Sequence, residues 1–285
     1  MAAGTLYVVA TPIGNLDDLS PRAAEVLRRV AVVVAEDTRR TRTLLAHAGA
    51  RPAHLLSMPA FDERGRVAGI VDRLAAGEDV ALVTDAGTPG VSDPGARLVD
   101  AAWGTGARVV PVPGPSAALA ALSASGFAAD RFHFAGFLPR KGGAREAALR
   151  SLAAARGTLV LFEAGNRAAG TLRDLREALG DRPAVLAREV TKLHEEILRG
   201  RLSDLEGRAG DGLRGEVTLV LAEAPGGAEG AAGQPDASAP PVEEEIRRRL
   251  AAGEPPVEVA RAVARGRGLT RREAYARVEA VRGRR

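Results

Sequence analysis

The sequence contains no cysteine and few aromatic residues. The lack of cysteine excludes disulfide bonds, thiolate metal sites and cysteine nucleophiles. The four histidines, His47, His54, His133 and His194, are too dispersed to match the spacing of a metal site. Aromatic residues make up only 3% of the chain, so the core has to be built mainly from alanine, valine and leucine.

Several common signatures are absent as well. There is no Gly-Lys-Ser/Thr of a Walker loop and no G-x-G-x-x-G of a dinucleotide site. No G-x-S-x-G marks a serine nucleophile. Apolar runs stay well below the roughly 18 residues of a membrane-spanning helix, and no signal-peptide pattern precedes the first apolar segment. We therefore expect a cytoplasmic protein with no metal and no membrane partner.

Positive charge is concentrated at the C-terminal end. The whole chain has a net charge of +4. Residues 243–285 contain twelve Arg and seven Glu, while the preceding residues contain 28 basic and 29 acidic groups. An arginine-rich segment suits contacts with phosphates, although a solvated helical face produces the same pattern.

Short apolar segments alternate with helical patterns through residue 222, which predicts an α/β fold with mostly parallel sheets. The first unit has predicted strands at 6–10, 30–35, 80–84 and 108–112, and predicted helices at 21–29, 38–48, 64–76 and 96–104. A stiff Pro-Gly-Pro segment near residue 113 separates it from a second unit. The predicted strands of that unit are 132–135, 158–163, 184–188 and 217–222. The predicted domains are therefore 1–113 and 114–222.

The remainder of the chain has a different composition. Residues 223–241 are rich in Ala, Gly, Pro and Ser and predict a disordered linker. Residues 242–285 predict a small basic domain of three helices, at 242–250, 255–265 and 270–281, similar to a helix-turn-helix unit. Thr270 and Glu273 have the spacing of a capping box at the start of the last helix.

The loop from Thr84 to Gly95, TDAGTPGVSDPG, is the most informative segment. It follows a predicted buried strand and contains three glycines, two prolines and two aspartates. Glycine lets a backbone approach a ligand closely, and proline restricts the loop to few conformations. Open α/β sheets bind ligands at the carboxyl ends of their strands, so this loop predicts a binding site.

Other polar loops also follow predicted strands. One is AEDTRRT from Ala35, where Glu36 or Asp37 can cap a helix or accept a proton, and Arg39 and Arg40 can be exposed or hold a phosphate. Glu63 lies at the start of a helix, where a carboxylate is favoured electrostatically. Further polar loops follow predicted strands at 11–18, 113–117, 136–143 and 188–192. Together these loops at strand ends predict one shared cleft.

Seven strings in one order carry a family resemblance. They are LYVVATPIGNLDDLSPRA, AEDTRRTRTLL, TDAGTPGVSDPG, VVPVPGPSA, DRFHFAGFLPRK, AREVTKLHEE and GEVTLVL, within residues 5–222. They resemble the tetrapyrrole-methylase superfamily of S-adenosylmethionine-dependent methyltransferases. Within it they are similar to the branch that methylates the 2′-hydroxyl of a cytidine in small-subunit (16S) ribosomal RNA.

This resemblance implies a fold of two α/β domains with S-adenosylmethionine in the cleft between them, followed by the small helical domain. It also implies a homodimer that acts on 16S rRNA in the small ribosomal subunit. The implied cofactor-binding residues are Asp85, Ala86, Gly87, Thr88, Pro89, Val91, Ser116, Ala117, Phe162, Glu163, Gly215 and Glu216.

Transfer of a methyl group to a ribose hydroxyl requires help, because a hydroxyl is a poor nucleophile at neutral pH. Asp37, Glu63 and Asp85 can supply a carboxylate, and we favour Asp37 or Glu63 as the catalytic group. The basic residues expected to hold RNA phosphates are Arg39, Arg40, Arg140, Lys141, Arg188 and Lys192.

Two other functions stay open at this stage. A methylase that acts on a corrin-type ring would share the cofactor site, although the basic loops and tail favour nucleic acid. A non-enzymatic regulator would bind nucleic acid with the terminal helices and sense a small molecule with the α/β part.

Overall fold

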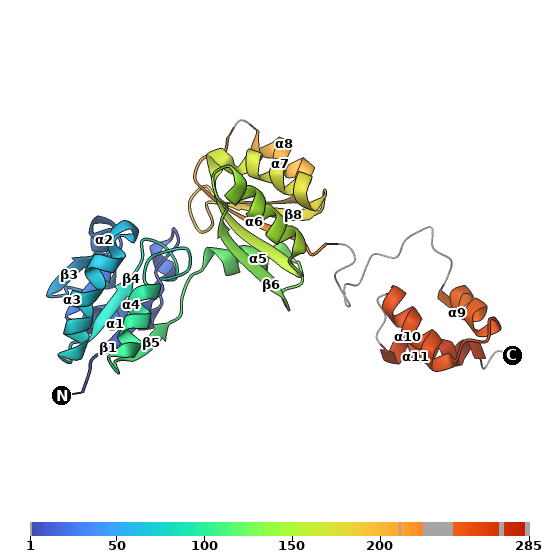
Figure 1. The fold of residues 1–285 in the computed structure, drawn as a ribbon, viewed down its shortest axis with the longest axis horizontal. Coiled ribbons are helices and arrows are strands. Elements are labelled where there is room, and N and C mark those ends of the chain that lie inside the picture. Colours follow the sequence, from blue (N-terminus) through green and yellow to red (C-terminus); the bar gives the residue numbers. More distant parts are fainter. Residues whose placement is uncertain (1, 211, 225–241, 268–270, 283–285) are drawn as a thin grey trace. The chain divides into compact units, whose positions relative to one another are not determined.

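The computed structural model describes residues 2–210, 212–224, 242–267 and 271–282. The chain divides into two compact units, residues 1–222 and 223–285. The first unit contains two five-stranded sheets, which Figure 1 shows in blue to green and in green to orange. No helix among the described residues is long and apolar enough to cross a membrane.

The first sheet is parallel throughout, with strand order β3-β2-β4-β1-β5. Its strands are β1 (Thr5–Val9), β2 (Val32–Ala35), β3 (His54–Ser57), β4 (Val80–Val83) and β5 (Arg108–Val112). The central strands β2 and β4 are buried along their whole length, which explains their continuous runs of valine, leucine and alanine.

Helices cover both faces of this sheet. They are α1 (Pro21–Arg29), α2 (Thr38–Ala48), α3 (Glu63–Ala75) and α4 (Ala96–Gly104). One apolar core joins α1 and α2 to one face, and a second joins α3 and α4 to the other. Because all strands are parallel, the loops after β1, β2 and β4 emerge at the same edge of the sheet.

The second sheet is mixed, with order β6-β7-β10-β8-β9. Its strands are β6 (Phe132–Phe137), β7 (Thr158–Ala164), β8 (Pro183–Arg188), β9 (Glu196–Arg201) and β10 (Glu216–Leu221). Only β6 and β7 pair in parallel, whereas β10 is antiparallel to β7 and β8, and β8 is antiparallel to β9.

Four helices pack on the second sheet. Helices α6 (Gly143–Ala154), α7 (Ala168–Leu179) and α8 (Leu202–Ala209) share an apolar core with one face of it. Helix α5 (Ala117–Ser125) packs on the other face. Ser116 caps α5 by accepting the N–H of Leu119 at 3.5 Å.

The second unit contains α9 (Val242–Ala251), α10 (Pro256–Arg267) and α11 (Arg271–Arg282). Their apolar side chains form a core of their own around Ile246, Val259, Val263 and Val278. The three predicted C-terminal helices are therefore confirmed. Residues 225–241 of the predicted linker and Thr270 of the predicted capping box lie outside the described residues.

One expectation about the strands was wrong, and two strands were not predicted. The second sheet is not mostly parallel, because β8 and β9 form an antiparallel pair and β10 lies between β7 and β8. Strands β3 and β9 were not predicted. Both are edge strands with exposed or half-buried residues, HLLS and EILRGR, and such segments lack the long apolar run that marks a central strand.

Candidate functional site

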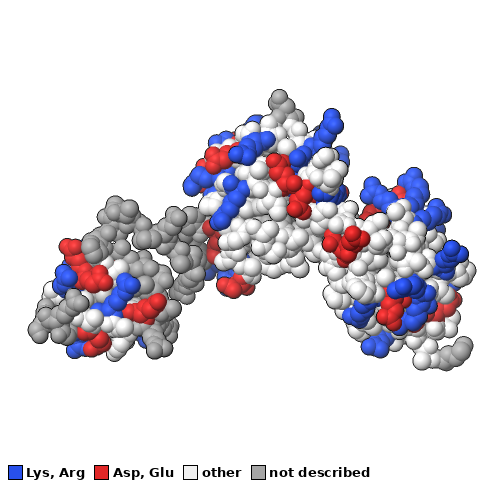
Figure 2. Space-filling model, turned by 180° about the vertical axis from the view of Figure 1, so that it is seen from behind, with Lys and Arg blue, Asp and Glu red and all other residues white. Residues whose placement is uncertain are grey.

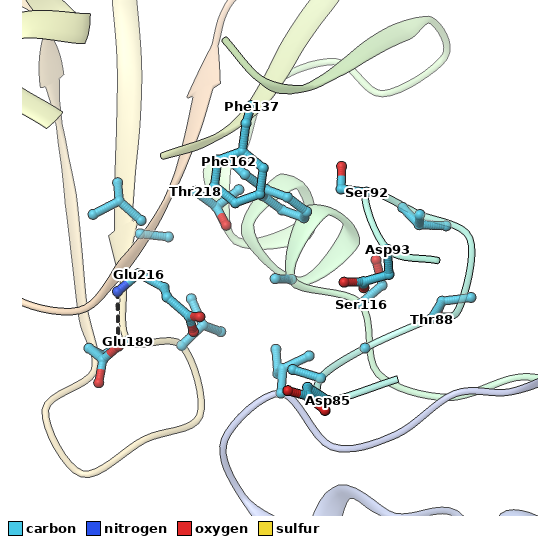
Figure 3. Close-up of a pocket in the computed structure, with 18 of the residues that line it drawn as sticks. Asp85, Thr88, Ser92, Asp93, Ser116, Phe137, Phe162, Glu189, Glu216 and Thr218 are labelled. Carbon is cyan, nitrogen blue, oxygen red and sulfur yellow. Dashed lines mark hydrogen bonds between the residues drawn. The ribbon is translucent and has the colours of Figure 1, made fainter. Parts of the chain in front are cut away.

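A partly open cavity of about 270 Å3 lies in the first unit. Figure 3 shows residues of the loop after β4 and residues of the second sheet around it. We call its lining residues between 13 and 93 the N-terminal wall: Ile13, Glu36, Arg40, Asp85, Ala86, Gly87, Thr88, Val91, Ser92 and Asp93. Those between 137 and 218 form the C-terminal wall: Phe137, Phe162, Glu163, Ala187, Glu189, Val190, Lys192, Glu216, Val217 and Thr218. Ser116 and Ala117, at the start of α5, complete the lining.

The loop 84–95 is tied to several other segments. Thr11 and Gly87 exchange two backbone hydrogen bonds, at 2.8 and 3.1 Å. The Thr88 hydroxyl donates to the Pro115 carbonyl at 3.3 Å, and the Asp37 N–H donates to the Asp85 carboxylate at 3.0 Å. The loop therefore forms a fixed surface against which a ligand can pack.

Two glycines permit close approaches around the cavity. A Cβ on Gly14 would overlap the side chain of Lys192, so the loop after β1 lies directly against the β8–β9 loop. A Cβ on Gly136 would lie 2.8 Å from the Ser92 hydroxyl oxygen, and Gly136 has a φ of +60°. A larger residue at either position would force the neighbouring side chain or the backbone to shift.

The N-terminal wall contributes three carboxylates. Glu36 accepts the Thr84 hydroxyl at 3.2 Å, and Asp85 lies 3.5 Å from the Arg40 guanidinium. Asp93 is half-buried, and burial raises the pKa of its carboxyl to about 6. That value also includes the negative charges of Glu36, Asp85 and Glu216, which raise the pKa, and a hydrogen bond with Thr84, which lowers it.

The C-terminal wall also contributes three carboxylates, each of which is paired with a cation. Glu163 is fully buried, 3.3 Å from Arg167, and accepts the Thr171 hydroxyl at 2.6 Å. Lys192 donates to Glu189 at 2.9 Å and to Glu216 at 2.8 Å. The hydrogen bonds from Lys192 and from the Glu216 N–H, the latter drawn in Figure 3, lower the pKa of Glu189.

An aromatic surface lies on the same wall. The rings of Phe137 and Phe162 are 5.6 Å apart at 58°, and Phe134 meets Phe162 edge-on at 5.0 Å. Phe137 is 55% exposed although it is large and apolar. An exposed ring at a cavity offers a face on which a planar ligand can stack.

The backbone is strained at the cavity. Among the described residues, Ser92, Glu189 and Thr191 are the non-glycine residues with positive φ, at +63°, +48° and +69°. Ser92 and Glu189 line the cavity, and Thr191 lies next to Lys192. Such conformations persist where the surrounding structure imposes them, and they cluster at functional sites.

Most predicted cofactor-binding residues lie together. Ten of them line the cavity: Asp85, Ala86, Gly87, Thr88, Val91, Ser116, Ala117, Phe162, Glu163 and Glu216. Pro89 and Gly215 adjoin lining residues but are not part of the lining. Gly215 has a φ of +87°, and a Cβ there would overlap the Glu189 carboxylate.

The two predicted catalytic carboxylates lie outside the lining. Asp37 caps α2 and binds Arg39, whose hydrogen bonds lower the pKa of Asp37 to about 2. Glu63 accepts the N–H groups of Gly95 and Arg97, at 3.0 and 3.1 Å. Both carboxylates thus form hydrogen bonds that stabilise the local backbone.

The predicted RNA-binding residues are spread over the first unit. Arg40 and Lys192 line the cavity, whereas Arg39, Arg140 and Lys141 are exposed in other segments. Arg188 is half-buried and pairs with Glu196 at 3.1 Å. On the face drawn in Figure 2, Lys and Arg side chains are interspersed with Asp and Glu side chains.

Several residues that line the cavity were not predicted from the sequence. Asp93 and Ser92 belong to the loop 84–95, whose composition already marked it, and Glu189 belongs to the AREVTKLHEE string. Thr218 and Phe137 lie on strands β10 and β6, and only the pairing of the sheet shows which of their residues reach the cavity. The described residues contain no group of three or more His, Asp or Glu placed to hold a metal ion.

The arrangement of a parallel N-terminal sheet, a mixed second sheet and a cavity lined from both parts is shared with known methylases. The family model described as Tetrapyrrole (Corrin/Porphyrin) Methylases matches residues 5–206. Uroporphyrin-III-C-methyltransferase from Thermus thermophilus is similar in structure, with a TM-score of 0.55, 27% identity, and coverage of 77% of this chain and 94% of that one. Cobalt precorrin-4 methyltransferase shares the fold at 21% identity, with a TM-score of 0.57 and coverage of 76% and 94%.

Curated relatives narrow the family further. Ribosomal RNA small subunit methyltransferase I of Xylella fastidiosa is 51% identical over 223 residues, 76% of this chain and 81% of that protein. The protein of the same name from Synechocystis is 41% identical over 274 residues, 95% of this chain and 96% of that protein. The chain belongs to the tetrapyrrole methylases and, within them, to the family of ribosomal RNA small subunit methyltransferase I.

Proposed function

We propose that this chain transfers the methyl group of S-adenosylmethionine to the ribose 2′-hydroxyl of a cytidine in 16S rRNA. Membership in the ribosomal RNA small subunit methyltransferase I family, at 41–51% identity to named relatives, is the observation that carries this proposal. The corrin-ring methylases share the fold at much lower identity, which disfavours the ring-methylating alternative. A regulator without enzymatic activity gains no support from these relatives.

The cavity has the chemistry that S-adenosylmethionine requires. This molecule combines a planar purine, a sulfonium cation and an amino acid end, and when bound it supplies an electrophilic methyl group. Phe137 and Phe162 offer an aromatic surface for the purine. Three carboxylates on the N-terminal wall favour a cation. Ser116 and Ala117, at the start of α5, suit a carboxylate, because the N-terminus of a helix attracts negative charge.

The predicted cofactor-binding residues are compatible with binding of S-adenosylmethionine in the cavity. The predicted RNA-binding residues are compatible with phosphate contacts near the cavity. Arg40 is 70% exposed at the side chain and reaches the cavity, so it can contact a phosphate next to the target nucleotide. Arg140 and Lys141 follow β6 in an exposed loop before α6, where they can do the same.

Three further parts of the proposal rest on the sequence, the homodimer on the family resemblance and the other two on composition and on the Pro-Gly-Pro segment. We propose that the chain acts as a homodimer, that it works in the cytoplasm without a metal, and that domain boundaries lie near residues 113 and 222. The basic helices of the second unit would then add affinity for RNA that does not depend on sequence.

Methyl transfer to isolated small ribosomal subunits tests the proposal. Subunits that lack the modification are incubated with S-adenosylmethionine carrying a labelled methyl group, and the rRNA is digested to nucleosides. We expect label in 2′-O-methylcytidine and little transfer to a short synthetic RNA. Label on a base, or efficient transfer to a tetrapyrrole instead of RNA, would contradict the proposal.

A further inference from the structure

The backbone around Asp93 holds its side chain at the cavity. Ser92 has a φ of +63° and Gly95 a φ of +133°, and the Gly90 N–H closes the turn by donating to the Pro94 carbonyl at 3.2 Å. Glu63 accepts the N–H of Gly95 at 3.0 Å and so ties this turn to α3. Figure 3 shows the Asp93 carboxylate directed into the cavity, near Ser116.

Asp93 differs from Asp85, the carboxylate of the N-terminal wall that is paired with a cation. Asp85 is bound through both oxygens, by the Asp37 N–H at 3.0 Å and by Arg40 at 3.5 Å. Glu36 is tied to the Thr84 hydroxyl. Among the described residues, neither Asp93 nor Glu36 forms an ion pair with Lys or Arg, and both carboxylates bond the Thr84 hydroxyl. Asp93 is the one of these two whose carboxylate Figure 3 shows directed into the cavity.

On the basis of the proposed function, we infer that the Asp93 carboxylate accepts the proton of the ribose 2′-hydroxyl during methyl transfer. The hydroxyl oxygen forms a new bond to the methyl carbon while the bond between carbon and sulfur breaks. The electron pair of the broken bond stays on sulfur, which becomes a neutral thioether. The hydroxyl proton moves to Asp93, so one positive and one negative charge disappear together.

The charges around Asp93 suit this role. Burial and the carboxylates of Glu36, Asp85 and Glu216 raise the pKa of Asp93 to about 6. The two cations in the lining are engaged elsewhere, Arg40 with Asp85 and Lys192 with Glu189 and Glu216. At pH 7 Asp93 is therefore ionised but more basic than an ordinary aspartate, and a general base works best when its pKa lies near the working pH.

The test compares Asp93→Asn with the control Asp100→Asn, which removes an exposed aspartate on α4. Single-turnover transfer to small subunits is followed as a function of pH, and the affinity for S-adenosylmethionine is measured by calorimetry. We expect the rate of Asp93→Asn to fall by about 100-fold or more. In the wild type the rate should rise with pH to a plateau above about 6, and this rise should be absent in Asp93→Asn.

The affinity for S-adenosylmethionine should change little in Asp93→Asn, and the control should match the wild type in every measurement. Asp93→Glu, which keeps a carboxylate, should recover part of the rate together with the rise at acidic pH. That partial recovery also separates loss of the proton acceptor from a folding defect in Asp93→Asn.

A wild-type rate and pH profile in Asp93→Asn would overturn the role of Asp93 and leave the proposed function standing. A loss of rate matched by an equal loss of affinity would overturn it too, because Asp93 would then serve to bind the methyl donor. No transfer by the wild-type chain, with the donor still bound, would instead overturn the proposed function itself and with it the role of Asp93.

Discussion

The two walls of the cavity each contribute three carboxylates, but they hold them differently. On the C-terminal wall, Glu163, Glu189 and Glu216 each lie within 3.3 Å of a cationic nitrogen from Arg167 or Lys192. Among the residues that the structure describes, the one ion pair of the N-terminal wall joins Asp85 to Arg40 at 3.5 Å, and the Arg40 side chain is 70% exposed.

Carboxylates that are paired with a cation and carboxylates that are not have different roles. A carboxylate whose charge is matched by a nearby cation is held in its ionised form and contributes to the fold. A carboxylate without such a partner, surrounded by other negative charges, stays available to a bound cation or to a proton. We therefore expect substitutions on the C-terminal wall to act mainly on stability, and those on the N-terminal wall mainly on ligand binding and rate.

The largest effect on stability is expected for Glu163→Ala. This change leaves Arg167 without its partner and the buried Thr171 hydroxyl without its acceptor. Breaking a buried pair in this way should lower the free energy of unfolding by about 3 kcal/mol. Urea denaturation measures it, with Glu146→Ala as control, because Glu146 pairs with Arg150 at the surface. Equal unfolding midpoints for the two variants would contradict the expectation.

Asp85→Ala should act on the ligand instead. Loss of this charge from the N-terminal wall should weaken the binding of S-adenosylmethionine by roughly 10- to 100-fold. The free energy of unfolding should fall by only about 1 kcal/mol, through the lost bond to the Asp37 N–H. Calorimetry and urea denaturation measure the two effects. Unchanged affinity with a large loss of stability would place Asp85 with the structural carboxylates.

Lys192→Met should destabilise the fold by about 1 kcal/mol at pH 7, because two half-exposed ion pairs are lost. The pKa of Glu189 is lowered in the folded state, so this stabilisation is present above the ordinary glutamate pKa and is lost as the pH falls through the lowered value. The gap between wild type and variant should therefore shrink in acid. The control Lys141→Met removes an exposed lysine and should unfold with the same free energy as the wild type. A difference between the wild type and Lys192→Met that grows in acid would contradict the pairing.

The smallest effect is expected for Glu63→Gln. Glu63 caps the start of α4 by accepting the N–H groups of Gly95 and Arg97, and the amide oxygen of the variant can still accept both. The rate of methyl transfer should change by no more than about 3-fold. A fall of about 100-fold would instead support Glu63 as the catalytic carboxylate that its position in the sequence suggested.

Much of the first unit could be predicted from its sequence. Helices α1, α2 and α4 begin and end as predicted, because Ser20 and Asp37 cap two of them and apolar residues recur at helical spacing. The loop 84–95 was identified from its glycines and prolines, and most of the expected cofactor residues do surround one cavity.

The sequence could not distinguish carboxylates by their partners. Asp37 and Glu63 were favoured as catalytic groups, but Asp37 caps α2 and Glu63 accepts N–H groups at the start of α4. Asp93 lies eight residues after Asp85 in the same loop, but its surroundings depend on Glu36 and Glu216, which are distant in sequence. The mixed second sheet was missed for a similar reason, since strand order depends on pairings between distant segments.

The contrast between the walls can be tested most directly by measuring the titration of Asp93 and Glu189 in the same protein. Carboxyl carbons labelled with 13C are followed by NMR as the pH changes, and Asp93→Asn and Glu189→Gln assign the two signals by difference. We expect Asp93 to titrate near pH 6 and Glu189 below the ordinary range of a glutamate. An Asp93 signal that titrates at or below 3.8, the ordinary aspartate value, would contradict the account.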